Sequence, residues 1–486
     1  MHRLAQMILA MGAAFIVSPV WGQASQDSGP ATSGDALYQT IKSMQEEMER
    51  LRSDNDAMKG QIDDLRAQTQ DNWLTEARAR EIRGLVEEVL ADSDARASLM
   101  NDGIMAGWSE HFFLADAFGR FLLEIEGMTQ IRFIYNYIDQ TGDRSRYGFE
   151  NARTRLTFRG HVFNDWEYMI RGEFNPHPPP NQQASDFSLL DAWVRYHLTT
   201  DWSVRAGQFK LPFNREELVS TTEQLAVERS NINEAMSLGR SVGIEIAYHD
   251  DANSFALAFS NGMSNRNTLM RVLMGGPQTS TSAIAANVEY AFTARYERLL
   301  AGTWSQFSDF TSPIDEEYGM LFGIAGHAQN NESSTTQIIG ESEPRSFSAT
   351  TDLSIEWGGA NAFVAAIYHY VDSPTFQLWN ILGVVAQAGV YITPKWEAFA
   401  RVEYGTVDNF GGGNNNVHDY GALTFGANYY IEGHDVKWTT DVGIGLTPVS
   451  SVGVPGTFSS ERTGWRDVEA TGLTEVVFRT QLQLLF

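Results

Sequence analysis

The chain has 486 residues, of which 43% are hydrophobic and 12% aromatic, and its formal net charge is −26. This composition is typical of ordered protein, and so acidic a chain is not expected to bind a nucleic-acid backbone. There is no cysteine, which excludes disulfides and thiolate sites, and the ten histidines show no HExxH spacing. We therefore expect no metal, no cofactor and no nucleic-acid partner.

The amino terminus carries the features of a secretion signal. Arg3 precedes an apolar run over residues 4–17, and the small residues Gly22 and Ala24 follow. This order predicts a signal peptide over residues 1–24. A single membrane anchor is the alternative, but the run is shorter than the ~18 apolar residues that a spanning helix needs.

Residues 35–68 carry a heptad pattern. Apolar residues recur at alternating steps of four and three, and Asn55 occupies a seam position that Ile41, Met48 and Ile62 hold elsewhere. The pattern predicts a coiled coil in which Asn55 sets the register, because a buried amide is best satisfied by its copy on a partner chain. An amphipathic helix packed on the same chain is the alternative.

A less regular helical segment follows, and we assign residues 69–110 to a helical linker. Beyond it the apolar period changes from seven to two. In FLLEIEGMTQIRFIYNY, residues 121–137, the odd positions are mostly apolar and the even ones mostly polar. Similar segments recur to the end of the chain. Two architectures have this pattern: a soluble β-sandwich or propeller, with the apolar faces toward a core, and a transmembrane barrel, with those faces toward lipid.

Four observations favour the barrel. Tyrosine and tryptophan cluster near predicted strand ends, as at Trp166 and Tyr196. Short connectors alternate with long polar ones, the signal peptide indicates export, and the sequence stops on a patterned strand ending in Phe486. We predict an all-β transmembrane barrel of antiparallel strands over residues 111–486. The short connectors are 358–361, 393–396 and 432–435, and the long ones are 176–188 and 406–419.

The block DAWVRYHLTTDWSVRAGQFKLPFNREELVSTTEQLAVERS, residues 191–230, resembles the phosphate-selective porin O/P family. Supporting segments lie at 149–174, 389–405 and 423–438. The resemblance implies about sixteen strands, a homotrimer in the outer membrane, and diffusion of small solutes and ions. It does not cover the coiled coil, for which a trimer would supply the partners. We expect that segment to form a periplasmic stalk, with a contact to the cell wall as a further hypothesis.

The stretch FENARTRLTFRG, residues 149–160, sorts its side chains onto two faces. Asn151 and three arginines occupy odd positions, whereas Leu156 and Phe158 occupy even ones. An arginine at the bilayer midplane costs about 2 to 4 kcal/mol, so the arginine face must line the lumen. The same alternation places Arg132 inward, and Lys210 stands where the family pattern has its lysine. The predicted pore-lining and anion-binding residues are Arg153, Arg155, Arg159, Arg171, Arg195, Arg205, Lys210, Arg401 and Lys437.

Two kinds of channel remain open. The family's anion-selective members carry a ladder of lumenal cations, whose donors would replace an anion's hydration shell step by step. Carboxylates share the same predicted face, however, and would pair with the arginines in a general diffusion porin. We expect the general or anion-preferring porin, with a phosphate- or polyphosphate-selective porin and a tether to the cell wall as alternatives. The predicted inward carboxylates are Glu124, Glu126, Glu167, Glu173, Asp191, Glu245, Glu397, Glu403 and Asp441.

We do not expect an enzyme. Adjacent carboxylates such as Glu216 and Glu217 are usually solvated charges, and no nucleophile and base accompany them in the sequence.

Overall fold

A computed structural model describes most of the barrel region and little of what precedes it. The predicted signal peptide lies outside the described residues. Only three residues of the predicted coiled coil are described, so both remain predictions. Among the described residues no helix is long and apolar enough to cross a membrane. The described residues are 49, 50, 59, 104–109, 111–138, 145–174, 187–263, 288–331, 344–373, 377–409, 417–447, 449, 458, 463–465 and 475–486.

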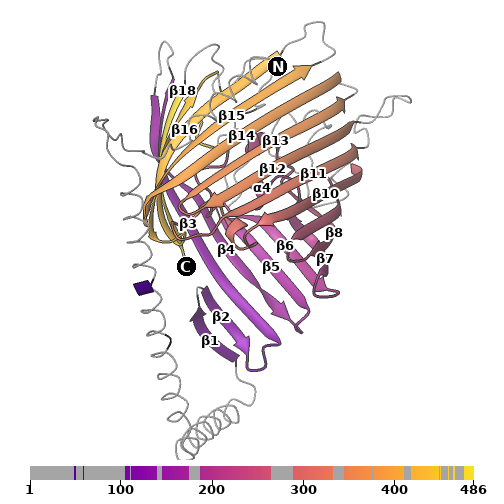
Figure 1. Ribbon diagram of the computed structural model, residues 1–486. Helices are drawn as coiled ribbons and strands as arrows, with labels where there is room; N and C mark the ends of the chain where they lie inside the picture. The colour runs from indigo at the N-terminus through magenta and orange to yellow at the C-terminus, as the bar shows by residue number, and fades with distance from the viewer. Residues whose placement is uncertain are drawn as a thin grey trace, which may run out of the picture. The chain divides into compact units, whose positions relative to one another are not determined.

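The chain divides into two compact units, residues 1–99 and 100–486, and the second holds the strands. Strands β3 to β18 form a closed antiparallel barrel of sixteen, in which each pairs with the next and β18 pairs with β3 (Figure 1). The predicted barrel is thereby confirmed. Its strands are β3 (Phe121–Ile138), β4 (Ser145–Val162), β5 (Trp166–Phe174), β6 (Phe187–His197), β7 (Trp202–Lys210), β8 (Arg240–His249), β9 (Asn253–Ser260), β10 (Val288–Ala301), β11 (Gly319–Asn331), β12 (Arg345–Trp357), β13 (Ala360–Ser373), β14 (Gln377–Thr393), β15 (Trp396–Asn409), β16 (Val417–Glu432), β17 (Val436–Gly445) and β18 (Glu475–Leu485).

A hairpin of β1 (Ile104–Ser109) and β2 (His111–Asp116) precedes the barrel. β2 pairs with the first residues of β3, on the edge that β18 occupies farther along the strand. Residues 104–109, which the sequence assigned to the helical linker, therefore form a strand.

The two rims of the barrel differ in their connectors. At one rim, six of the seven turns have two to four residues, and we call this the short-turn rim. The connectors at the opposite rim are mostly longer. The predicted short connectors fall at the first rim and the predicted long ones at the second. Phe486 also lies at the short-turn rim, where its backbone N–H donates to the carbonyl of Gly127 at 2.9 Å. This asymmetry is the one expected of outer-membrane barrels.

Side chains alternate between lumen and outer surface along each strand. In β12, Ser348, Thr350 and Asp352 are buried inside, while Phe347 is exposed outside. One irregularity interrupts the pattern in β4. Gln130 pairs with Arg153, whereas the next residue of β3 pairs with Asn151, so β4 carries an extra residue there. A bulge of this kind shifts the parity by one.

Because of the bulge, the predicted direction of one side chain, Asn151, is wrong. Asn151 was predicted to share the arginine face, but it is exposed and hydrogen-bonded to the side chain of Thr154. Glu150 points inward in its place and forms an ion pair with Arg132. The three arginines that follow in β4 keep their predicted inward direction.

Candidate channel constriction

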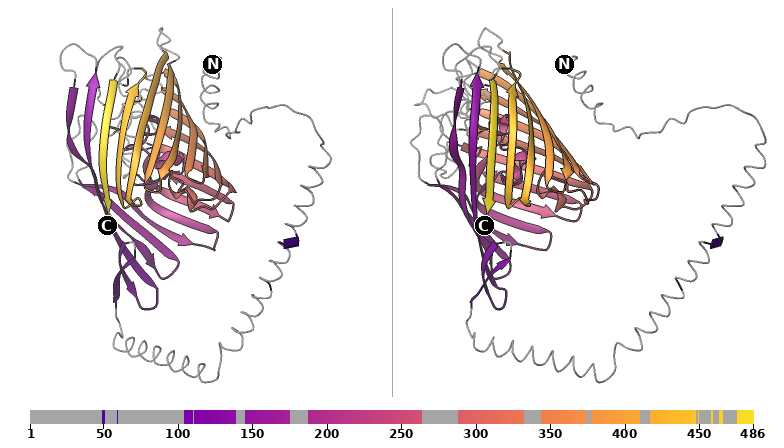
Figure 2. Two further views of the ribbon diagram at one scale, coloured as in Figure 1. Left: turned by 60° about the vertical axis from the view of Figure 1, so that its left-hand side comes forward. Right: turned by 90° about the vertical axis from the view of Figure 1, so that its left-hand side faces the viewer.

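The connection from β7 to β8, residues 211–239, folds into the barrel, and we call it the inner loop. It contains two short helices, α4 (Arg215–Leu218) and α5 (Asn231–Met236), and almost all of its residues are buried. α5 packs against β14 and β15. Gly383 of β14 makes room for it, since a Cβ there would lie 2.5 Å from the sulfur of Met236 and 2.6 Å from a methyl of Ile232. The inner loop therefore lies inside the barrel, with α5 against β14 and β15 (Figure 2).

Glu228 of the inner loop clamps two wall arginines. Both carboxylate oxygens accept from Arg153, at 2.8 and 2.6 Å, and Arg132 bonds to the same carboxylate. The side chains of Arg153 and Glu228 are only 5% and 2% exposed, so the pair lies away from water. Burial opposes ionisation, but the charges of Arg153 and Arg132 outweigh it and hold the pKa of Glu228 at about 2.

Other wall cations bond to backbone carbonyls of the inner loop. Lys437 donates to the carbonyls of Thr222 and Gln224, both at 2.9 Å. Arg401 donates to the carbonyl of Glu228 at 2.8 Å. Lys210, just before the loop, donates to the carbonyls of residues 217 and 218 at 2.6 and 3.2 Å. These three predicted anion-binding residues thus anchor the constriction.

A second segment enters the lumen from the short-turn rim. It is the connector 302–318, which contains the 3-10 helix η2 (Gln306–Ser308). Arg215 of α4 donates to its Phe307 carbonyl at 2.5 Å, and its guanidinium lies 5.6 and 5.4 Å from the ring centroids of Phe307 and Phe310. The two segments meet beside β12, where Arg215 also donates to Ser354 at 2.9 Å. They fill the lumen along β10–β17, whose described inward side chains are mostly buried.

Charged side chains that reach water lie mainly on the opposite wall, β3–β8. Arg159 pairs with Glu124 at 2.7 Å, and their side chains are 37% and 30% exposed. Glu167 and Arg195 form a comparable pair at 3.0 Å. We call the inner face of β3–β8 the wet wall.

Four charges lie side by side across the wet wall. Glu167, Arg195, Arg205 and Glu245 occupy facing register positions on β5, β6, β7 and β8. Each arginine pairs with its neighbouring carboxylate, at 3.0 Å for Arg195 and 2.8 Å for Arg205. Trp193 supports both guanidiniums, whose centres lie 5.0 and 5.5 Å from its ring centroid. Two cations therefore adjoin one another between two anions.

All the predicted pore-lining residues lie inside the barrel or at the base of the inner loop, but they do not form one free ladder. Arg155 pairs with Glu173 at 3.1 Å and donates to Thr221 of the inner loop at 2.8 Å. Arg171 lies 3.8 Å from Asp191. With the contacts above, each of the nine has a carboxylate or a loop carbonyl as its partner.

Several lumenal charges were not predicted from the sequence. Arg295 and Arg479 lie at inward positions of β10 and β18, and the alternation in those strands could have identified them. They pair with Asp352 and Asp441, at 2.8 and 2.7 Å. Glu228 lies in an aperiodic segment that gave no signal of its inward fold.

Glu223 of the inner loop has a pKa near neutral pH. Burial and the nearby Asp309 raise its pKa to about 7, so it is neutral below this pH and gains a negative charge above it. We expect the channel to become more cation-preferring between pH 6 and pH 8, measured as zero-current potential in a KCl gradient. Glu223→Gln should abolish most of this change, and an undiminished change in the variant would assign it to another group.

Residues 124–342 match the family described as phosphate-selective porin O and P. An uncharacterised protein of Aquifex aeolicus (strain VF5) is 25% identical over an alignment of 334 residues, which covers 63% of this chain and 78% of that protein. Among solved structures, Salmonella typhi OmpF in complex with daunomycin has 13% identity and a TM-score of 0.48, covering 78% of this chain and all of that one. An anion-selective porin from Comamonas acidovorans has 11% identity and a TM-score of 0.47, covering 75% and 99%.

A sixteen-stranded barrel with an inward-folded loop and a charged inner wall defines the class of outer-membrane porins. Within this class, residues 124–342 match the model of the phosphate-selective porin O and P family. The resemblance seen in the block 191–230 is thereby confirmed.

Proposed function

We propose that the protein is a general diffusion porin, which passes small hydrophilic solutes and ions through the lumen beside the wet wall. A barrel of sixteen strands is wide enough to leave an aqueous channel. The inner loop and the connector 302–318 fill the β10–β17 side, and the inner loop also reaches Arg132 and Arg153 of β3 and β4. The solutes therefore move past the part of β3–β8 that the inner loop leaves open to water. No bond is made or broken in this process, so we propose that the protein is a channel and not an enzyme.

The pairing of the lumenal cations carries this proposal. Arg159 and Arg195, which are partly exposed on the wet wall, and the mostly buried Arg205 each pair with a carboxylate. Such pairs produce a transverse field with little net charge, and selectivity is set by the charges at the constriction. The channel is therefore expected to distinguish weakly between anions and cations.

A phosphate- or polyphosphate-selective channel is the second candidate. Arg195 and Arg205 are neighbours in register, and the Nε atom of each has no hydrogen-bond partner among the described residues. Two adjacent guanidiniums suit a phosphate group, because each presents paired donors to its oxygens.

We further propose a homotrimer in the outer membrane, with the short-turn rim and the predicted coiled-coil stalk on the periplasmic side. The exposed apolar outer face of the barrel suits lipid, and the trimer is what the family resemblance implies. Contact of the stalk with the cell wall remains a hypothesis, tested by envelope attachment after deletion of residues 35–100.

The test is the zero-current potential of the purified full-length protein in a planar bilayer under a KCl gradient, repeated with phosphate added. We expect conductance with weak selectivity and little block by phosphate. Strong anion preference with block at low phosphate would favour the second candidate instead. An absence of conductance would contradict both.

A further inference from the structure

The hairpin β1–β2 continues the outer surface of the barrel. β2 faces β3 through the pairs Phe112–Ile125 and Leu114–Leu123, and Trp108 of β1 pairs with Phe112. Since facing residues lie on the same side of a sheet, these five side chains share one face. It is the outward face, because Glu124 between the two β3 residues points into the lumen toward Arg159.

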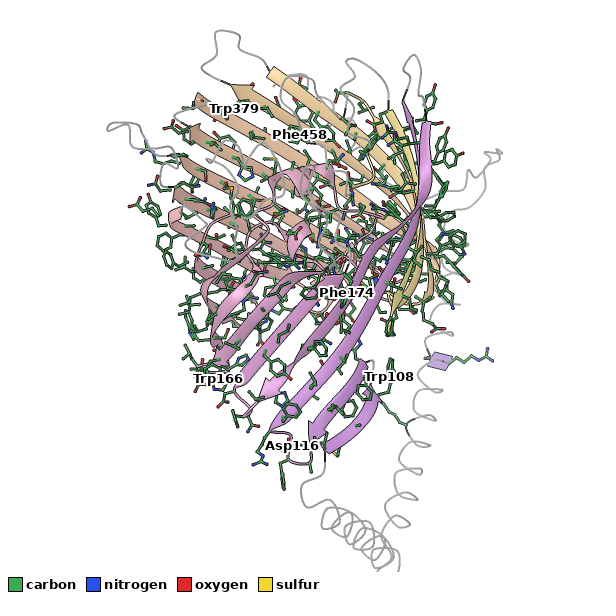
Figure 3. All side chains as sticks on the ribbon, turned by 180° about the vertical axis from the view of Figure 1, so that it is seen from behind. Trp108, Asp116, Trp166, Phe174, Trp379 and Phe458 are labelled. Carbon is green, nitrogen blue, oxygen red and sulfur yellow. The ribbon has the colours of Figure 1, made fainter. Side chains whose placement is uncertain are left out.

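This apolar face is unpartnered among the described residues. Trp108 is 63% exposed, and Ile104 and Phe112 are exposed as well; Figure 3 shows Trp108 on the hairpin, beside the first strand of the barrel. The register carries the face onto the outer surface of the barrel. Ile125 faces Phe158 of β4, which in turn faces the exposed Ile170 of β5.

The turns β2–β3 and β4–β5 at the same rim each carry an exposed phenylalanine. Phe118 is 80% exposed and Phe163 is 78% exposed. Their turns adjoin, since the N–H of Phe163 donates to the carbonyl of Arg120 at 2.8 Å. The Arg120 guanidinium lies 5.1 Å from the ring centroid of Phe118 and is itself exposed. An exposed aromatic ring beside an exposed cation suits the boundary between lipid chains and headgroups.

We propose that the outer face of β1–β2, with Phe118 and Phe163, contacts the lipid bilayer at the short-turn rim and fixes the start of the barrel to the membrane surface. The proposal rests on the proposed function, which places the barrel in a membrane. Continuity with the apolar outer surface of β3–β5 favours lipid over a protein partner, because the register joins the hairpin to the exposed Ile170 along one uninterrupted sheet.

The chain has no cysteine, so single cysteines can carry an environment-sensitive fluorophore without background. Trp108→Cys and Phe118→Cys report on the proposed contact, Met105→Cys reports on the opposite face of β1, and Ile170→Cys reports on the barrel surface. Each full-length variant is reconstituted in phosphatidylcholine–phosphatidylglycerol vesicles. Quenching is then compared between spin-labelled lipid and aqueous iodide.

We expect the Trp108→Cys and Phe118→Cys labels to be quenched by spin-labelled lipid several-fold more than the Met105→Cys label, and to be protected from iodide. Quenching by iodide alone, or protection from both quenchers, would overturn the proposal in favour of water or a protein partner. The Ile170→Cys label separates this failure from another: if spin-labelled lipid does not quench it, the barrel is not inserted and the proposed function fails. A Trp108→Cys variant that does not fold leaves Phe118→Cys to decide.

Discussion

Glu228→Gln should raise the channel conductance roughly twofold or more and shift its selectivity toward anions, because breaking a buried ion pair costs about 3 to 5 kcal/mol and leaves its partner uncompensated. Arg132 and Arg153 would both lose the carboxylate that holds the inner loop to the β3–β4 wall. The loop would then loosen, and the lumen would gain one uncompensated positive charge at Arg153, because Arg132 keeps Glu150 as its partner. Single-channel conductance and zero-current potential in KCl measure the two effects.

Glu124→Gln is the matched control. It removes the same charge from an ion pair of the same barrel, but Arg159 and Glu124 are partly exposed and lie on the wall. Water can solvate the freed arginine, so we expect a smaller shift in selectivity and an unchanged conductance. Equal conductance changes in the two variants would mean that Glu228 does not hold the constriction.

The double variant Arg195→Ala/Arg205→Ala should make the channel clearly cation-selective, with the permeability ratio of potassium to chloride rising by roughly threefold or more, because lumenal charge sets the local ion concentrations. The change removes the two central cations of the row of four, so Glu245 loses its arginine and Glu167 keeps only its contact with His197. Zero-current potentials at low ionic strength give the ratio.

Removing two arginines also changes the net charge of the whole molecule, and a second double variant controls for this. Arg120→Ala/Arg345→Ala removes two exposed arginines, 65% and 62% exposed, outside the wet wall. We expect its permeability ratio to stay near that of the parent protein. A comparable rise in both double variants would show that the overall field, and not the row on the wet wall, governs selectivity.

The barrel and its inward faces could be predicted because side-chain direction in a strand depends on a period of two, which the sequence displays. Arg153, Arg195 and Arg401 lie inside for this reason. The prediction of Asn151 was wrong because a bulge changes the parity by one residue, and nothing in the local composition marks it.

The constriction could not be predicted in the same way. The inner loop has no periodic pattern, and its position depends on contacts far apart in sequence, such as Glu228 with Arg153 and α5 with Gly383. The roles of Lys437 and Arg401 depend on the same fold: alternation indicated that they face inward, but not that loop carbonyls occupy their donors.

Two strands, β2 and β18, pair with the same edge of β3, but they can do so at very different stages of folding. β18 joins β3 only after the fourteen intervening strands are in place, so until then the segment Met128–Ile138 presents an unpaired edge, which is open to pairing with other chains. β2 is adjacent in sequence and can pair with Leu122–Ile125 at once, since local contacts form before distant ones. The hairpin thus covers the first residues of that edge during assembly. A shorter part of the edge then stays unpaired until β18 closes the barrel.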